Sequence, residues 1–195
     1  MAQEVTTYQI RITLKETEPA VWRQLEVVSN MSLNNLAWAL SLSMGWECYH
    51  LYLFEVDGRE YGDIERDDMG GWFNDRTIKI YDLVKRGVKS FKFLYDFGDG
   101  WEHEVEIGKE VQAKSELSYP ICIDGQYACP PEDCGGPGGF AEYKKAIKDS
   151  KHPRHQELLD WRGPYDLTDF NIELANNKMI SKKIPKNLKI KQLEA

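Results

Sequence analysis

Two segments with two-residue alternation stand directly before one segment with helical periodicity, and this order limits the folds open to the chain. In TTYQIRITL the apolar residues share one face, as in a half-buried strand: Tyr8, Ile10, Ile12 and Leu14. After a Glu-Pro break, VWRQLEVV alternates again and predicts the second strand of a hairpin. The apolar face of such a hairpin needs a covering layer, which the following helix can supply.

The helical segment is predicted to run from Leu33 to Met44. Apolar residues recur there at helical spacing: Leu33, Leu36, Leu40 and Met44. Ser32 is a suitable N-cap and Gly45 a suitable C-terminal stop.

Further strands are predicted in HLYLFEVDGREYGD, which contains an Asp-Gly turn, and in KSFKFLYDF. DRTIKIYDLVKRG is expected to hold a short strand and one helical turn. The resulting order predicts an α+β fold with a mixed sheet of β-grasp (ubiquitin-like) order. The strands at residues 8–14 and 91–97 are then expected in one sheet, crossed by the helix at 33–44.

The C-terminal half changes in character. ELSYPICIDGQYACPPEDCGGPGG predicts a long structured Cys/Pro/Gly loop, and three short helices are expected in FAEYKKAIKDS, HPRHQELLDWRG and FNIELANNKMI. We expect residues 1–177 to form a single domain and residues 178–195 to form a basic, mobile tail.

Charge and composition narrow the function classes. The net charge is −7, and the last 18 residues carry six lysines and one glutamate, which leaves −12 for residues 1–177. A body this acidic repels a phosphate backbone, so nucleic-acid binding is disfavoured. With no secretory signal, no membrane-spanning run and four cysteines, the chain is expected to be cytoplasmic with reduced thiols.

The segment YDFGDGWEHEVEI carries the main candidate site. A hairpin with a three-residue loop at 98–100 places the apolar faces of its two strands together and pairs Tyr95 with His103. The same register sets Asp96 opposite Glu102, with Asp99 at the tip. Such clustered carboxylates suit Mg²⁺ or Mn²⁺, although a solvated hairpin tip with a core His103 explains the same pattern.

The three cysteines of the long loop offer another metal site. Cys122, Cys129 and Cys134 can bind Zn²⁺ with His103 or His50 as the fourth ligand, but the short C-x2-C spacing typical of zinc sites is missing. Small thiols packed inside a tight loop are the alternative.

Several motifs together carry a family resemblance: EPAVWRQLEV, WECYHLYLFEVDGREYGD, YDFGDGWEHEVE and YPICIDGQYACPPEDCGGPGGFAEY, followed by HPRHQELLDWRGPYDLTDFNIELAN. In order and spacing they resemble the plasmid pRiA4b ORF-3-like family over residues 5–177. Some members of that family carry a name that links them to insertion elements, which implies a mobile-element role. The chain itself has no recombinase signature.

No catalytic residues are assigned, because no nucleophile–base arrangement follows from spacing. A non-catalytic binding module of unknown ligand or protein partner is therefore the main functional prediction. Its expected surface lies where the hairpin meets the CPPEDCGG loop: Tyr95, Asp96, Asp99, Trp101, Glu102, His103, Glu132 and Asp133. The alternatives are a metal-dependent hydrolase or phosphoesterase on the hairpin residues Asp96, Asp99, Glu102 and His103, and a mobile-element or DNA-associated protein.

Overall fold

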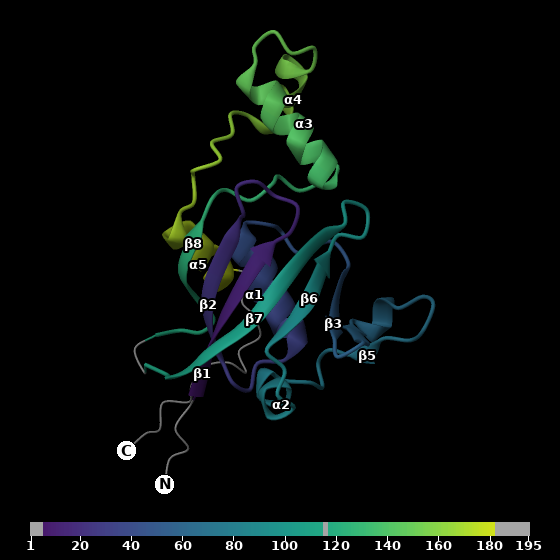
Figure 1. The fold of residues 1–195 in the computed structure, drawn as a ribbon, viewed down its shortest axis with the longest axis vertical. Coiled ribbons are helices and arrows are strands. Elements are labelled where there is room, and N and C mark those ends of the chain that lie inside the picture. Colours follow the sequence, from purple (N-terminus) through teal and green to yellow (C-terminus); the bar gives the residue numbers. More distant parts are fainter. Residues whose placement is uncertain (1–5, 115–116, 182–195) are drawn as a thin grey trace.

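The computed structural model describes residues 6–114 and 117–181, which form an α+β fold around one large sheet (Figure 1). The eight strands of this sheet are β1 (Thr6–Leu14), β2 (Trp22–Val28), β3 (Tyr52–Val56), β4 (Arg59–Gly62), β5 (Phe73–Asn74), β6 (Ser90–Tyr95), β7 (Trp101–Gln112) and β8 (Ile121–Gln126). Their order is β5-β4-β3-β6-β7-β1-β2-β8, and every pair is antiparallel except β4 with β5.

The N-terminal hairpin and the first helix form as the sequence predicts. In the β1–β2 hairpin Ile10 pairs with Leu25, so the apolar faces of both strands coincide. Helix α1 (Leu33–Met44) begins after Ser32, whose side chain accepts a 3.3 Å hydrogen bond from the Asn35 amide. It ends at Gly45, whose φ of 107° suits a glycine C-cap.

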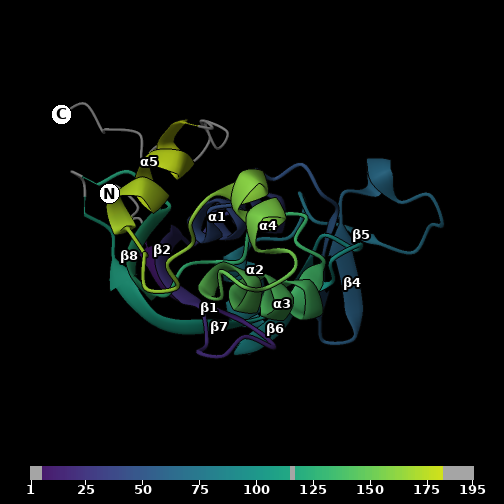
Figure 2. The ribbon, with the colours of Figure 1, turned by 90° about the horizontal axis from the view of Figure 1, so that it is seen from above.

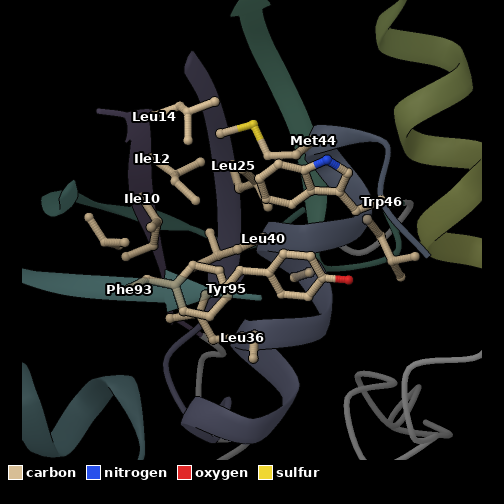
Figure 3. Packing of buried hydrophobic residues seen from close by; sticks show 14 of the residues in the cluster. Ile10, Ile12, Leu14, Leu25, Leu36, Leu40, Met44, Trp46, Phe93 and Tyr95 are labelled. Carbon is tan, nitrogen blue, oxygen red and sulfur yellow. The ribbon is translucent and has the colours of Figure 1, made fainter. Parts of the chain in front are cut away.

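The core lies between the sheet and α1. Leu36 and Leu40 of the helix are fully buried, as are Ile10 and Ile12 of β1 and Phe93 of β6. Figure 3 shows these side chains in one packed cluster. The C-terminal half of α1 is buried all round because α5 (Ile172–Ser181) contacts it as well.

The β-grasp order is not confirmed. The strands β1 and β6 share a sheet, as predicted, but the twelve-residue strand β7 lies between them and pairs with both. The sheet is also mostly antiparallel. Strand β7 pairs with β6 through residues 101–106 and with β1 through residues 103–112. Local periodicity does not encode this long-range arrangement.

Two local predictions need correction. The first part of the predicted long loop is the edge strand β8, which pairs with β2 through residues such as Cys122 opposite Leu25. The strand expected near Ile78 is reduced to one bridge between Ser32 and Lys79, and the chain continues into the short helix α2 (Ile80–Lys85).

The other two helices, α3 (Gly136–Lys148) and α4 (His155–Arg162), form a pair at one end of the sheet (Figure 1), and Figure 2 shows the same pair from above. The segment after α4 returns along the sheet to α5. Helix α5 runs on to Ser181, so the predicted tail starts within it, and residues 182–195 lie outside the described part. Among the described residues, no helix has the length and apolarity needed to cross a bilayer.

Candidate functional site

The hairpin between β6 and β7 has a five-residue connection, Asp96–Gly100, called the hairpin tip below. Tyr95 pairs with Trp101, and Phe93, not Tyr95, pairs with His103, so the predicted register is wrong by two residues. The cause lies at Asp96, whose φ of 58° ends the strand and whose amide donates a 2.8 Å hydrogen bond to Leu51 O. A shift of two residues keeps the side-chain parity, so the apolar faces still coincide as predicted.

The corrected register separates the predicted carboxylate cluster. Glu102 lies opposite Leu94, not Asp96, and is exposed to solvent. Asp96 is buried at 7% exposure, and its Oδ1 accepts a 3.0 Å hydrogen bond from the Gly98 amide. The structure therefore does not place Asp96 and Glu102 side by side.

Asp99 joins the hairpin tip to the loop that precedes α3. Its Oδ2 accepts a 3.2 Å hydrogen bond from the Gly135 amide, next to the helix N-terminus. The backbone approach is so close that a Cβ added to Gly136 would lie 2.3 Å from Asp99 O. Gly136 thus serves close backbone packing.

The segment Tyr127–Gly135, called the cysteine loop below, contacts the sheet through Glu132. Glu132 is 7% exposed; its Oε1 accepts a 2.6 Å hydrogen bond from the Tyr95 hydroxyl, and its Oε2 accepts one of 2.9 Å from the Glu47 amide. Burial, with the hydrogen bond to Glu132, raises the pKa of Tyr95. The phenol therefore stays protonated and remains the donor.

An aromatic layer supports this contact from behind. The Trp46 ring stacks on Tyr95 at a centroid distance of 4.8 Å, and both side chains are labelled in Figure 3. The Nε1 of Trp46 donates a 3.0 Å hydrogen bond to Pro130 O. Trp101 and His103 also pack against Trp46 and are 1% exposed. Burial lowers the pKa of His103 to about 4, so its ring is neutral at physiological pH.

Beside the hairpin tip, His50 brings two aspartates together. Its Nε2 lies 3.1 Å from Asp133 Oδ1 and 3.5 Å from Asp96 Oδ2. Within residues 6–114 and 117–181, these three form the only group of three or more His, Cys, Asp or Glu residues whose ligand atoms all lie within 4.8 Å. Neither predicted metal set, the hairpin acids or the cysteines with His103, forms such a group among the described residues.

Cys122, Cys129 and Cys134 are free thiols, and all three lie in the described part of the chain. Burial raises the pKa of Cys122 and Cys129, and raises that of Cys134 to about 12. At neutral pH these side chains are protonated, small and packed, which matches the alternative that the sequence left open for them.

A pocket of about 770 Å³ opens on the other side of the cysteine loop. Its walls come from the end of α1, the cysteine loop, the α3–α4 pair, the return segment and α5; they include Trp46, Cys129, Glu132, Tyr143, Tyr165 and Phe170. The buried Arg23 of β2 also lines it. The three hydrogen bonds of Arg23 all go to backbone carbonyls, those of Ser43, Trp22 and Gln126.

Comparison with known proteins identifies the family of the chain. The family model for the plasmid pRiA4b ORF-3-like protein matches residues 6–174. The chain belongs to the plasmid pRiA4b ORF-3-like family. It is 35% identical over 177 residues to the "Uncharacterized protein y4hQ" of Sinorhizobium fredii, covering 90% of this chain and 89% of that protein.

The fold of this pRiA4b ORF-3-like chain also resembles a solved structure. It matches the crystal structure of the protein of unknown function MM3350 from Methanosarcina mazei Go1 with a TM-score of 0.79 and 30% identity. The match covers 88% of this chain and 98% of that one, so the likeness extends over most of both chains.

In this pRiA4b ORF-3-like protein, only some of the residues predicted for the junction between the hairpin and the loop lie together. Tyr95, Asp96, Asp99, Glu132 and Asp133 meet where the hairpin tip contacts the cysteine loop. Trp101 and His103 lie behind them in the core, and Glu102 faces solvent.

Sequence reasoning missed Trp46 and Tyr49, and it considered His50 only as a fourth zinc ligand beside the cysteines, not as a partner of Asp96 and Asp133. Trp46, Tyr49 and His50 follow α1 directly in the run WECYH, whose density of aromatic and titratable residues in a loop was the available signal.

Proposed function

We propose that this protein is a non-catalytic binding domain that takes a small molecule with one acidic group in the pocket beside Arg23. A volume of about 770 Å³ suits a small-molecule ligand. Of the predicted site residues, Glu132 lines this pocket and Tyr95 holds Glu132 in position.

The observation that carries the proposal is the burial of Arg23 without an ion-pair partner. Its residue is 2% exposed, yet it forms no ion pair with a carboxylate anywhere in the described residues. A buried guanidinium without a counter-ion costs free energy, and the effect of burial here is to lower the pKa of Arg23. An anionic group bound in the pocket would supply the missing charge.

Part of the lining favours an apolar ligand body, although Glu47, Glu132, Arg162, Asp169 and Lys178 line the pocket as well. Tyr143, Tyr165 and Phe170 contribute rings, and Pro130 and Pro131 contribute rigid apolar surface. Phe170 also stacks on the Arg23 guanidinium at 3.9 Å, which fixes the side chain in place. A flat or aromatic molecule with one carboxylate or phosphate fits these walls.

The free thiols of Cys122, Cys129 and Cys134 support a cytoplasmic location, where cysteines stay reduced. The proposal of a binding domain depends on the pocket beside Arg23 and not on the basic tail. The mobile-element or DNA-associated alternative depends on the basic tail, most of which lies outside the described residues, and the acidic body opposes it.

A metal-dependent hydrolase is the second candidate function. The His50, Asp96 and Asp133 group favours it, because imidazole and carboxylate are the ligands of many hydrolytic metal sites. It shares only Asp96 with the hairpin residues that the sequence suggested for this chemistry.

The binding proposal is tested by calorimetric titration of the purified protein with phenylacetate and phenyl phosphate, using benzyl alcohol as the neutral control. We expect saturable binding of at least one anion, about tenfold or more tighter than benzyl alcohol. No saturable binding of either anion at concentrations up to about 10 mM would contradict the proposal.

A matched pair of variants on α5 locates the binding. Leu174 and Ile180 are 66% and 65% exposed, but only Leu174 lines the pocket. Leu174→Glu places a negative charge at the pocket and should weaken binding of the anion about tenfold, whereas Ile180→Glu should leave the affinity unchanged. Equal affinity of both variants and the wild type would move the ligand out of this pocket.

A further inference from the structure

The group formed by His50, Asp96 and Asp133 joins three segments that are far apart in the chain. His50 lies between α1 and β3, Asp96 begins the hairpin tip, and Asp133 belongs to the cysteine loop. Asp96 is buried at 7% exposure, and the side chains of His50 and Asp133 are 22% and 51% exposed.

The distances within the group suit a single bound ion. Zinc binds histidine nitrogen and carboxylate oxygen at about 2.0–2.2 Å, so neighbouring ligand atoms around one ion lie about 3.0–3.5 Å apart. The His50 Nε2 atom lies 3.1 Å from the oxygen of Asp133 and 3.5 Å from that of Asp96. An ion can therefore contact all three with little movement of the side chains.

The histidine nitrogen has no other partner. His50 Nε2 is a buried atom that makes no hydrogen bond, although two carboxylate oxygens lie within 3.5 Å of it. A hydrogen bond needs alignment as well as distance, and neither oxygen is aligned with the ring nitrogen. A buried nitrogen without a partner costs free energy that metal coordination would recover.

The surrounding donors orient both carboxylates toward the histidine. Asp133 Oδ2 accepts a 2.7 Å hydrogen bond from the Tyr49 hydroxyl, which leaves Oδ1 toward His50. Asp96 Oδ1 accepts the Gly98 amide at 3.0 Å, which leaves Oδ2 toward His50. Hydrogen bonds that hold the second oxygen of a ligating carboxylate are a regular feature of metal sites.

The ring of His50 is held in the same way. It contacts the Tyr95 ring edge-on at a centroid distance of 5.7 Å and the Tyr49 ring at 4.4 Å. These two rings fix the direction of the imidazole, so the site is organised before an ion arrives.

We infer that His50, Asp96 and Asp133 bind a first-row divalent transition-metal ion such as Zn²⁺ or Mn²⁺. One imidazole nitrogen with two carboxylate oxygens suits these ions better than Mg²⁺ or Ca²⁺, which take oxygen ligands. The side chain of Asp133 is 51% exposed, so one side of the ion faces solvent and its remaining positions are open to water or to a small ligand. This inference does not depend on the pocket beside Arg23.

The test is calorimetric titration of chelator-treated protein with Zn²⁺, Mn²⁺ and Mg²⁺, together with thermal unfolding in each metal. We expect one Zn²⁺ or Mn²⁺ per chain, a rise in melting temperature, and much weaker Mg²⁺ binding. Asp133→Asn should weaken the affinity for the metal ion about tenfold or more. Because Asp133 is half exposed, this variant should still fold, and circular dichroism checks it.

Control variants separate the three metal sets that the chain offers. Glu102→Gln and Cys129→Ser should keep wild-type affinity, because neither residue belongs to the His50 group. His50→Gln should lose binding as Asp133→Asn does. Absence of Zn²⁺ and Mn²⁺ binding up to about 1 mM, or wild-type affinity in Asp133→Asn, would overturn the inference. Loss of Zn²⁺ in Cys129→Ser alone would assign the ion to the cysteines instead.

Discussion

The hydroxyl of Tyr95 donates a 2.6 Å hydrogen bond to Glu132, and this contact ties the end of β6 to the cysteine loop. Both residues are buried, so the hydrogen bond replaces water that neither group can reach. Glu132 lines the pocket and the Tyr95 ring contacts His50, so this hydrogen bond connects the pocket to the His50 group.

Tyr95→Phe should therefore destabilise the protein. Removing the hydroxyl leaves Glu132 Oε1 buried without its donor, at a cost of about 1–3 kcal/mol in the free energy of unfolding. Urea unfolding measures this cost. Tyr81→Phe, at a residue 44% exposed, is the control and should stay within about 0.5 kcal/mol of wild type. Equal stability of both variants would show that the contact is not formed.

Two glycines near the start of α3 should respond in opposite ways to alanine. Gly136 has a φ of 67° and Asp99 O stands 2.3 Å from its added Cβ, so Gly136→Ala should cost about 2 kcal/mol or more. Gly138 has nothing within 4 Å of an added Cβ, and Gly138→Ala should be neutral or stabilise by up to about 1 kcal/mol. The comparison uses urea unfolding of both variants, and a tolerated Gly136→Ala would refute the packing of the hairpin tip on the start of α3.

His103 should make the protein less stable in acid. Its pKa is about 4 in the folded state and 6.5 in the unfolded state, so between these values the unfolded chain binds more protons. The contribution is present above about pH 6.5 and is lost as the pH falls toward 4, by about 3 kcal/mol in total. His103→Leu should show a smaller loss of unfolding free energy between pH 7 and pH 4.5 than wild type. The same loss in both proteins would mean that His103 is protonated in the fold.

The cysteines of the loop should stay reduced and react slowly. Burial raises the pKa of Cys129 and Cys134, so little thiolate is present at neutral pH. Alkylation by iodoacetamide at pH 7.5, followed by mass spectrometry, should modify them slowly in the native protein and quickly in urea. A disulfide between Cys129 and Cys134 in protein purified without oxidant would contradict this prediction.

Local signals explain which parts of the fold could be predicted. Helix α1 and its two caps follow from neighbouring residues, since Ser32 and Gly45 act within one turn. For the hairpin, the sequence predicted which side chains share a face but not which residues pair. The strand β6 ends at Asp96 because the Asp96 amide bonds to Leu51 O, which lies 45 residues earlier. The position of β7 between β1 and β6 also depends on contacts between residues far apart in the chain.

The residues of the candidate site also differ in whether the sequence could predict them. Tyr95 and Glu132 could be named from the hairpin and the CPPEDCGG run, although their hydrogen bond could not. His50 was missed as a partner of Asp96 and Asp133 because 46 and 83 residues separate it from them, and no periodicity relates those positions. Arg23 was missed as a pocket residue because alternation shows only that it faces inward, not that it lacks a carboxylate partner.

The most direct test of the binding proposal observes Arg23 itself. The Nε–H of Arg23 donates a 3.0 Å hydrogen bond to Ser43 O, so it should give a resolved signal in a nitrogen-15 NMR spectrum. Arg11 is the internal control, because its guanidinium also stacks on a ring, that of Trp22 at 3.8 Å, but does not line the pocket. On titration with phenylacetate or phenyl phosphate, the Arg23 signal should shift to saturation while the Arg11 signal stays in place. An Arg23 signal that does not move as the protein saturates, or equal shifts of both arginines, would contradict the account.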